Sequence, residues 1–320
     1  MSTLAVLVRY QIPLAESPTF RGLQEALRAQ PDLARQLAVM IWDNSPAALT
    51  PSQQPPGLFY RHAHANLGPA GAYNEAMQYA LARGDDWMLL LDQDTAITSD
   101  FLTTMLRHAN QLALQTRIAA IAPTVRVRGL VVSPRRQRFN SHCQYPAAEI
   151  GIAPGEAFAI NSGCLIRVAA LRKIGGFSTD FWLDYSDMYV FHQFFLHGLK
   201  VWRATDAELQ HDMSIMDYDR LMTPWRYRNY SFAEGAFNDL YKGRLENTVQ
   251  TLRLFVRAVK QRFKYRNPAF SRITREQLWY RLRVPRSART AQWFTEGRKR
   301  LEPQTENVPR QERSSSDEAA

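Results

Sequence analysis

The sequence predicts an α/β fold in which a mainly parallel sheet, covered by helices, is followed by a basic helical extension. Over the first 125 residues, short apolar segments alternate with segments of helical spacing, the pattern of parallel strands joined by right-handed crossovers. Beyond residue 222, apolar residues recur at helical spacing among many Arg and aromatic residues. We expect an α/β domain at 1–222, the helical extension at 223–300 and a disordered polar tail at 301–320.

The first half of the α/β domain has a signal for each expected element. Helical spacing through Phe20, Leu23 and Leu27 predicts a first helix, and a second helix runs from the turn at Gly68-Pro69 to Gly84. The last strand is apolar along its whole length, which is typical of a strand covered on both faces. The four expected strands are LAVLVRY (4–10), LAVMIW (37–42), LFY (58–60) and WMLLLD (87–92).

The second half of the domain is less regular. Residues 125–160 contain several prolines and a basic stretch, and we expect a loop or hairpin there that borders the functional site. The segment 161–177 predicts a strand and a short helix that ends at Gly175-Gly176. The segment 181–198 predicts a helix ended by Gly198, and a brief strand follows around LKVW.

The extension is expected to begin with a helix over 223–243 and to continue with a basic amphipathic helix over 245–266. The second helix carries Leu252, Phe255, Val256 and Val259 at helical spacing, with Arg253, Arg257, Lys260 and Arg262 among them. Such a segment, with Trp residues nearby, suits the interface of an anionic membrane, and its composition also suits nucleic acid. A helical bundle packed on the α/β domain is the third alternative.

Composition limits the class of protein. With 320 residues, 45% of them hydrophobic, the chain can bury a substantial core. Two cysteines, Cys143 and Cys164, are too few for a disulfide scaffold and favour a reducing compartment. No signal peptide and no run of about 18 apolar residues is present, so we expect a cytoplasmic protein, with a peripheral position on the inner face of the cell membrane.

The formal net charge of +10 is unevenly distributed along the chain. Residues 242–300 hold 17 Lys or Arg against 3 acidic residues, a balance of +14, whereas residues 301–320 hold 2 against 5. Residues 1–241 therefore carry a balance of −1. The basic character belongs to the extension, and the chemistry of the α/β domain takes place in a nearly neutral body.

Three carboxylates follow predicted strands directly: Asp43 after the second strand, and Asp92 and Asp94 after the fourth. In open α/β sheets, ligands bind beyond the carboxyl ends of the strands. Two carboxylates at this spacing suit a hard cation such as Mg²⁺ or Mn²⁺, whose remaining ligands are often waters and phosphates. Capping of the next helix is an equally good explanation from spacing alone, although Ser99 and Asp100 are better placed for it.

Several other enzyme classes lack their motifs in this sequence. There is no G-X-S-X-G elbow, no paired Cys motif for zinc, no P-loop and no GXGXXG fingerprint. The sequence instead resembles the family 2 glycosyltransferases, and within them the rhamnosyltransferase-like group of bacterial polysaccharide biosynthesis. The matching stretches, in order, are a first strand, Asp43-Asn44-Ser45, NLGPAGAYN (66–74), LLLDQDT (89–95), NSGCLI (161–166), GGFSTDFWLDYSD (175–187) and His211.

The resemblance implies a GT-A-like, Rossmann-type fold and a nucleotide-sugar site. Asp43 would accept hydrogen bonds from the pyrimidine base, while Asn66 and Gly68 would lie beneath the nucleotide, where Gly allows close backbone approach. Asp92 and Asp94 would hold Mg²⁺ or Mn²⁺ against the diphosphate of the donor, with Asp94 in direct contact. His211 would complete the metal shell or touch the diphosphate, although a lone His is more often structural.

The resemblance also assigns the acceptor side. Asp187 would be the general base that removes a proton from the acceptor hydroxyl, and Asp184, three residues earlier on the predicted helix, would point to the same face. Relatives commonly have an acidic residue two positions after the base and a basic one six positions after it, where this chain has Tyr189 and Gln193. Ser162 and Gly163 would form a turn beside the donor sugar. Arg226 and Arg228 could reach phosphate or lipid headgroups.

These assignments imply an inverting transferase, because one base and no second nucleophile point to a single displacement. The donor expected is dTDP-β-L-rhamnose, and the acceptor a polyprenyl-diphosphate-linked or oligosaccharide part of a bacterial surface glycan. A transferase that uses a UDP-sugar such as UDP-galactofuranose is one alternative. A nucleotide- or nucleic-acid-binding protein that acts through its basic tail is another, although nucleic acid is less favoured than a membrane surface.

Overall fold

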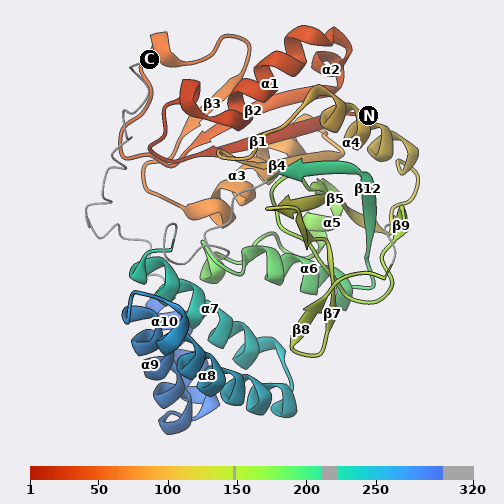
Figure 1. Ribbon diagram of the computed structural model, residues 1–320. Coiled ribbons are helices and arrows are strands. Elements are labelled where there is room, and N and C mark those ends of the chain that lie inside the picture. The colour runs from red at the N-terminus through yellow and green to blue at the C-terminus, as the bar shows by residue number, and fades with distance from the viewer. Residues whose placement is uncertain (147–148, 211–221, 298–320) are drawn as a thin grey trace, which may run out of the picture.

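The structure is a computed structural model that describes residues 1–146, 149–210 and 222–297. Its centre is a nine-stranded sheet in the order β3-β2-β1-β4-β11-β5-β12-β9, with β6 paired to β5 (Figure 1). The strands are β1 (Thr3–Arg9), β2 (Leu37–Asp43), β3 (Phe59–His62), β4 (Trp87–Asp92), β5 (Ile118–Val127), β6 (Leu130–Ser133), β9 (Gly151–Ile152), β11 (Leu165–Arg167) and β12 (Lys200–Gln210).

The sheet is mainly parallel, as predicted. Strands β3, β2, β1 and β4 run in one direction, and β5 and β12 share it on the far side of the antiparallel β11. The four strands expected in the first half of the domain are confirmed to within three residues at each end. Because β1, β2 and β4 are parallel neighbours, their carboxyl ends meet at one edge, where Asp43 and Asp92 are the last residues of their strands.

Helices cover both faces of the sheet. The alternation of side chains along β1 defines the faces, since Leu4 and Val6 belong to one buried cluster and Ala5 and Leu7 to the other. The first cluster contains residues of α3 (Gly68–Arg83), α5 (Val168–Lys173) and α6 (Ser186–Leu196). The second contains residues of α1 (Pro18–Ala29), α2 (Pro31–Gln36) and α4 (Ser99–Gln111). This three-layer arrangement is the predicted GT-A-like fold.

The irregular segment after β5 forms a second, small sheet. It contains β7 (Arg135–Arg138), β8 (Ser141–Cys143) and β10 (Ala157–Phe158), in the order β10-β7-β8. The β7–β8 pair is a hairpin, as expected for this region. The predicted helix over 181–198 is shorter than expected: α6 begins at Ser186, because Tyr185 adopts a left-handed conformation with φ of 68°.

Four helices form the C-terminal extension: α7 (Pro224–Tyr241), α8 (Arg244–Lys264), α9 (Ala269–Arg283) and α10 (Arg286–Gly297). They gather at one end of the molecule next to α6 (Figure 1). An aromatic cluster joins them to the α/β domain, since Phe181 packs against Phe237 of α7 and Trp293 of α10. The packed bundle that the sequence left as one alternative is therefore observed. No helix within the described ranges could span a membrane.

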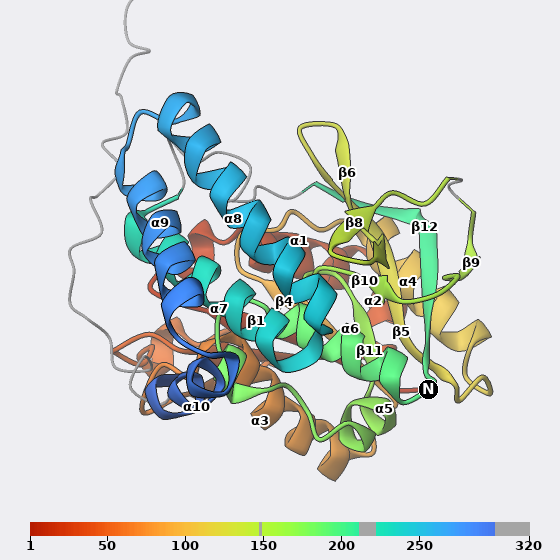
Figure 2. The same cartoon turned by 90° about the horizontal axis from the view of Figure 1, so that it is seen from below.

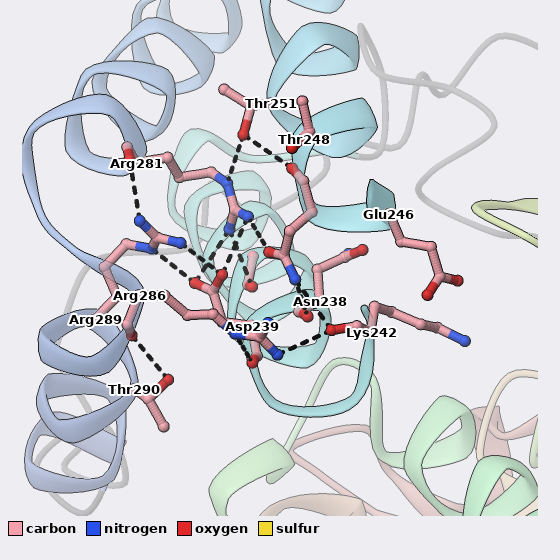
Figure 3. A network of polar contacts seen from close by, with 12 residues as sticks. Asn238, Asp239, Lys242, Glu246, Thr248, Thr251, Arg281, Arg286, Arg289 and Thr290 are labelled. Atoms are coloured by element: carbon pink, nitrogen blue, oxygen red, sulfur yellow. Dashed lines mark hydrogen bonds and ion pairs between the residues drawn. The ribbon is translucent and has the colours of Figure 1, made fainter. Parts of the chain in front are cut away.

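The interior of the extension is held by buried ion pairs. Asp239 of α7 accepts hydrogen bonds from Arg281 of α9 at 3.1 and 3.2 Å and from Arg289 of α10 at 2.6 and 2.7 Å (Figure 3). Glu234 of α7 and Arg257 of α8 form a second, bidentate pair with distances of 2.6 and 2.7 Å. All four helices are thus connected through carboxylates of α7.

Candidate active site

Asp43, at the end of β2, is buried and fully occupied by neighbouring groups. Its carboxylate accepts hydrogen bonds from the Arg9 guanidinium at 2.6 Å, the Tyr60 hydroxyl at 2.7 Å and the Ser45 N–H at 3.0 Å. Burial raises the pKa of Asp43, but the hydrogen bonds outweigh that effect and the net pKa is lowered. Asp43 is therefore ionised and organises the end of the sheet, and because it is fully buried, contact with a base would require neighbouring groups to move.

The segment after Asp43 connects β2 to the start of α3. The Asn44 amide donates to the carbonyl oxygen of Gly68 at 3.2 Å, and its oxygen accepts from the Trp42 indole at 3.0 Å. Asn66 accepts from the N–H of Gly68 at 2.9 Å. Gly68 has φ of +64°, and a Cβ there would lie 2.4 Å from the carbonyl oxygen of Trp182. Only glycine fits, so the predicted close backbone approach is a contact with the protein's own chain.

Hydrogen bonds from the segment that contains Ser17 and Thr19 fix the loop after β4. The Thr19 hydroxyl lies 2.6 Å from the carbonyl oxygens of both Asp92 and Thr95, and the Ser17 hydroxyl donates to Gln93 at 2.6 Å. Gln93 in turn accepts from the N–H of Tyr10 at 2.8 Å. These contacts fix the backbone that carries Asp92 and Asp94. The two aspartates do not cap α4, because the Thr98 hydroxyl does so.

Asp92 is half-buried, and Asp94 is exposed. The hydroxyl of the buried Tyr73 lies 3.4 Å from Oδ1 of Asp92, and the pKa of Tyr73 is raised by burial and by this carboxylate. The donor set of two carboxylates fits Mg²⁺ or Mn²⁺ if water and phosphate supply the other ligands. Among the residues that the structure describes, no group of three or more His, Cys, Asp or Glu could hold a metal ion by itself.

The predicted third ligand, His211, lies outside the described residues. Gln210, the last residue of β12, forms an isolated antiparallel bridge with Ala96. The described part of β12 therefore ends next to the loop that follows Asp94. The assignment of His211 to the metal stays a prediction.

Ser162 and Gly163 contact the end of β4, next to Asp92. The Ser162 hydroxyl is 2.9 Å from the Thr95 hydroxyl and 3.4 Å from the N–H of Asp92, and Gly163 donates to Leu90 at 2.7 Å. Gly163 has φ of +81°, and a Cβ would lie 2.2 Å from Cδ1 of Leu209. Both residues are buried, so they support the loop that carries Asp92, and their predicted place beside the donor sugar is not tested by these contacts.

Asp187 lies in the first turn of α6, close enough to Asp92 for the two carboxylates to interact electrostatically. Its Oδ1 accepts from the N–H of Met188 at 2.8 Å. The pKa of Asp187 is raised to about 7, mainly by burial and further by the carboxylates of Asp184 and Asp92, while the N–H of Met188 opposes the rise. A carboxylate with a pKa near neutrality can both accept and release a proton, which is what a general base requires.

Asp184 is not on the helix of Asp187, and the prediction of a shared helix face was wrong. The left-handed Tyr185 separates the two residues, because the chain turns there before α6 begins. The side chain of Asp184 is only 9% exposed, and its Oδ1 forms an ion pair with Nη2 of Arg226 from α7 at 2.9 Å. Burial raises the pKa of Asp184, and Arg226 opposes that effect. Its Oδ2 is buried without a hydrogen-bond partner among the described residues.

The two arginines at the start of α7 have separate places. Arg226 reaches the site through Asp184, whereas Arg228 forms an ion pair with Glu276 of α9 and lies over the ring of Phe232. These contacts do not test the assignment of Arg228 to the nucleotide, which stays a prediction. Residues two apart point in different directions on a helix, so only one of the pair could face Asp184.

Tyr189 occupies the position where relatives commonly have an acidic residue. Its ring stacks on Phe181 at 6.3 Å and lies 5.9 Å from Tyr241 of α7. Tyr189 is therefore part of the aromatic contact between α6 and the extension. Gln193, where relatives commonly have a basic residue, is half-buried one helical turn farther along α6. Tyr189 thereby contributes to the hydrophobic attachment of α7.

Sequence reasoning missed one residue of this site, Tyr73, and one pairing, that of Arg226 with Asp184. Tyr73 contacts Asp92, and its only sequence signal was a place in the NLGPAGAYN stretch, on the α3 face that covers the sheet. The pairing of Arg226 with Asp184 joins residues 42 positions apart in the chain, and no local pattern contains that information. Because a buried carboxylate needs a partner, a cation near Asp184 could have been expected. The sequence did not show which cation it would be.

Comparisons with known proteins give two kinds of match. Residues 42–175 match the family model described as glycosyl transferase family 2. Galactofuranosyltransferase GlfT1 of Mycobacterium tuberculosis, from strains CDC 1551 / Oshkosh and H37Rv, is 26% identical over 257 residues, which cover 76% of this chain and 81% of the relative. The family match contains Asp43, Asn66, Gly68, Asp92, Asp94, Ser162 and Gly163.

Solved structures of S. aureus TarS are also similar. The crystal structure of TarS 1–349 has a TM-score of 0.48 at 13% identity, covering 93% of this chain and 90% of that chain. The crystal structure of TarS 1–349 in complex with UDP has a TM-score of 0.47 at 13% identity, covering 96% and 94%.

Proposed function

We propose that this chain, which carries a family 2 glycosyltransferase domain over residues 42–175, transfers one sugar from a nucleotide donor with inversion at the anomeric carbon. The observation that carries the proposal is Asp187: a carboxylate with a raised pKa of about 7, in the first turn of α6 and within electrostatic range of Asp92. A single ionisable base on one side of the donor, and a carboxylate pair for its diphosphate on the other, suit one direct displacement.

In this mechanism Asp187 accepts the proton of the acceptor hydroxyl as the hydroxyl oxygen attacks the anomeric carbon. The bond between that carbon and the diphosphate oxygen breaks, and the nucleoside diphosphate leaves with the electron pair. Asp92 and Asp94 would hold the divalent cation, whose positive charge would stabilise the leaving diphosphate. Arg226 is a positioning residue, because it pairs with Asp184 and so fixes the turn that presents Asp187.

Two donors have separate support. The galactofuranosyltransferase GlfT1, 26% identical to this chain, supports UDP-galactofuranose. The order of motifs in the sequence supports dTDP-β-L-rhamnose, as expected above. The relative is the stronger support, because its match covers 81% of that protein's length, and we place UDP-galactofuranose first. The acceptor in either case would be a lipid-linked or growing bacterial surface glycan.

The base is tested by Asp187→Asn. The amide has almost the same shape but takes up no proton, so transfer should fall by about 10²–10⁴-fold while the donor still binds in a thermal-shift assay. Asp100→Asn, in the exposed first turn of α4, is the matched control and should transfer normally. Transfer at the wild-type rate by Asp187→Asn would remove Asp187 from the mechanism.

The cation is tested separately by Asp94→Ala and by EDTA. Both should abolish transfer, and Mg²⁺ or Mn²⁺ should restore it after EDTA but not in Asp94→Ala. Transfer that is indifferent to EDTA would leave Asp92 and Asp94 with a structural role.

The donor is tested by incubation with a panel of UDP- and dTDP-sugars, Mg²⁺ or Mn²⁺ and a lipid-linked acceptor, with products read by mass spectrometry. Galactofuranose and rhamnose add different masses, because rhamnose lacks one oxygen. A product with neither mass would reject both donors while leaving the transfer reaction itself intact.

A further inference from the structure

The helix α8 has its polar side chains turned toward the protein. Asn247, Gln250 and Gln261 are all less than 10% exposed. Asn247 donates to the carbonyl oxygen of Asn238 at 2.8 Å, and Gln261 donates to the Tyr227 hydroxyl at 2.8 Å. This polar face packs on α7 and α9, where Arg257 also pairs with Glu234. The inward side of α8 is therefore mixed, because Leu254 and Ala258 are buried there among the polar side chains.

The opposite side of α8 is apolar and exposed. We name it the outer face, and it consists of Leu245 (69% exposed), Leu252 (64%), Phe255 (56%), Val256 (43%), Val259 (48%) and Phe263 (85%). Their spacing of three, four or seven residues places all of them on one stripe of the helix. In the view from below, α8 and α9 lie nearest the viewer, in front of the rest of the molecule (Figure 2).

An amphipathic helix of a soluble domain normally points its apolar stripe at the core, and α8 does the reverse. A contiguous apolar patch of this kind marks a surface that is covered in the working protein. Asn247 and Gln261 form hydrogen bonds on the inward face, and a rotation of α8 that buried the apolar stripe would break these bonds. The polar contacts therefore hold the orientation of α8, and none of the residues that the structure describes covers the outer face.

The charges along the outer face indicate what kind of partner covers it. Arg244 and Arg262 border the stripe on one side and Lys260 on the other, and all three are exposed. Glu246 is the only acidic residue of α8, and its carboxylate is engaged by the N–H of Gly243 at 2.8 Å. An apolar stripe between cationic borders matches the acyl chains and the anionic headgroups of a lipid surface.

We propose that the outer face of α8 is a docking surface for an anionic lipid bilayer, in which the helix lies parallel to the membrane plane. Leu252, Phe255 and Phe263 enter the boundary between headgroups and acyl chains, and Lys260 and Arg262 contact the phosphates. On the neighbouring helix α9, the exposed Trp279 is of a residue type that anchors proteins at this depth.

Other occupants fit less well. A second copy of the chain would bring the cationic borders of two α8 helices together, with no acidic partner among them. Nucleic acid would match the charges but not the apolar stripe. The chain's own residues 298–320 offer only Leu301 and Val308 as large apolar side chains, too few to cover six positions.

The test is co-sedimentation of the full-length protein with vesicles of phosphatidylcholine alone or with phosphatidylglycerol added. Binding should require the anionic lipid and should weaken with salt. Phe255→Ser/Phe263→Ser should lower the partition coefficient by about 10- to 100-fold. The matched control is Leu114→Ser/Leu130→Ser, which removes two exposed apolar side chains of the α/β domain and should bind as the wild type does. Circular dichroism verifies that both variants are folded.

A second variant, Lys260→Glu/Arg262→Glu, leaves the apolar stripe intact and reverses the charge of two residues that border it. It should lose binding to anionic vesicles. Equal binding by all variants, or no binding by the wild type at low salt, would overturn the proposal. So would a dimer in light scattering that Phe255→Ser/Phe263→Ser dissociates, since a second copy would then cover the face. Salt-sensitive RNA binding that the charge reversal abolishes, without vesicle binding, would overturn it in favour of nucleic acid.

Discussion

The α/β domain and the helical extension are built in opposite ways. In the α/β domain, apolar side chains of the strands fill two clusters, and the polar groups of the site lie at the carboxyl edge of the sheet. In the extension, buried carboxylates and guanidiniums share the interior with apolar side chains such as Phe237 and Phe270, and α8 turns an apolar stripe outward. The extension therefore combines an apolar core with buried ion pairs, and those ion pairs are stable only while both partners are present.

The two interiors should respond differently to mutation. A buried apolar side chain can be shortened at a cost that depends on the cavity left behind. A buried ion pair contributes little net stability while intact, but the loss of one partner leaves an uncompensated charge in a dry environment. Single substitutions in each region therefore test whether the two interiors differ in this way.

The largest effect is expected for Asp239→Ala. This change strands the guanidiniums of Arg281 and Arg289, whose side chains are 1% and 9% exposed, and should cost about 3–5 kcal/mol in free energy of unfolding. Urea denaturation of the full chain measures it. Asp32→Ala, in an exposed pair with Arg35, is the control and should change stability by less than about 0.5 kcal/mol. A cost below about 1 kcal/mol for Asp239→Ala would mean that the aromatic cluster, not the ion network, holds the extension.

A matched pair of Leu→Ala changes compares the regions directly. Leu90 is fully buried in β4, and its truncation should cost about 2–5 kcal/mol. Leu252 lies on the outer face of α8 with 64% exposure, and the same change should cost less than about 0.5 kcal/mol. Thermal or urea denaturation without lipid measures both. Equal costs would show that the outer face of α8 is covered in the isolated protein.

The contact between the regions is tested by Arg226→Gln. Loss of this cation leaves Asp184 buried without a partner, so the turn before Asp187 should shift and kcat should fall by about 10- to 100-fold. Arg228→Gln separates this role from the one the sequence suggested: since Arg228 pairs with Glu276, we expect less than about a twofold change. Steady-state kinetics with the identified donor measure both. A larger loss for Arg228→Gln would restore the predicted nucleotide contact.

The smallest effect is the pH dependence of transfer. Asp187 must be ionised to accept a proton, and its pKa is raised to about 7 by burial and by the carboxylates of Asp184 and Asp92. The protonated form therefore accumulates as the pH falls below about 7, and kcat/KM should decrease by about tenfold per unit there and level off above. A profile that is flat between about pH 5.5 and 8 would contradict a base with a raised pKa.

Much of the α/β domain could be predicted because local patterns suffice for it. A short apolar run such as WMLLLD that ends in turn-forming residues is typical of a strand covered on both faces, and the same pattern placed Asp92 and Asp94 at its end. The error at Asp184 has a local cause of another kind. Tyr185 takes a left-handed conformation that residues of its type rarely adopt, so nothing in FWLDYSD predicted a break before Ser186.

The sequence alone was enough to place the strands that end at Asp43 and Asp92 and the helix α3, and to show that α8 is amphipathic and basic, whereas β5, α9 and α10 were not predicted. Only the tertiary structure decided that Asp43 is occupied by Arg9 and Tyr60, that Arg226 pairs with Asp184, and that the apolar stripe of α8 points outward. The physical reason is the same in all three cases. Periodicity in a sequence shows that a helix has two unlike faces, but the direction in which each face points depends on partners that lie far away along the chain.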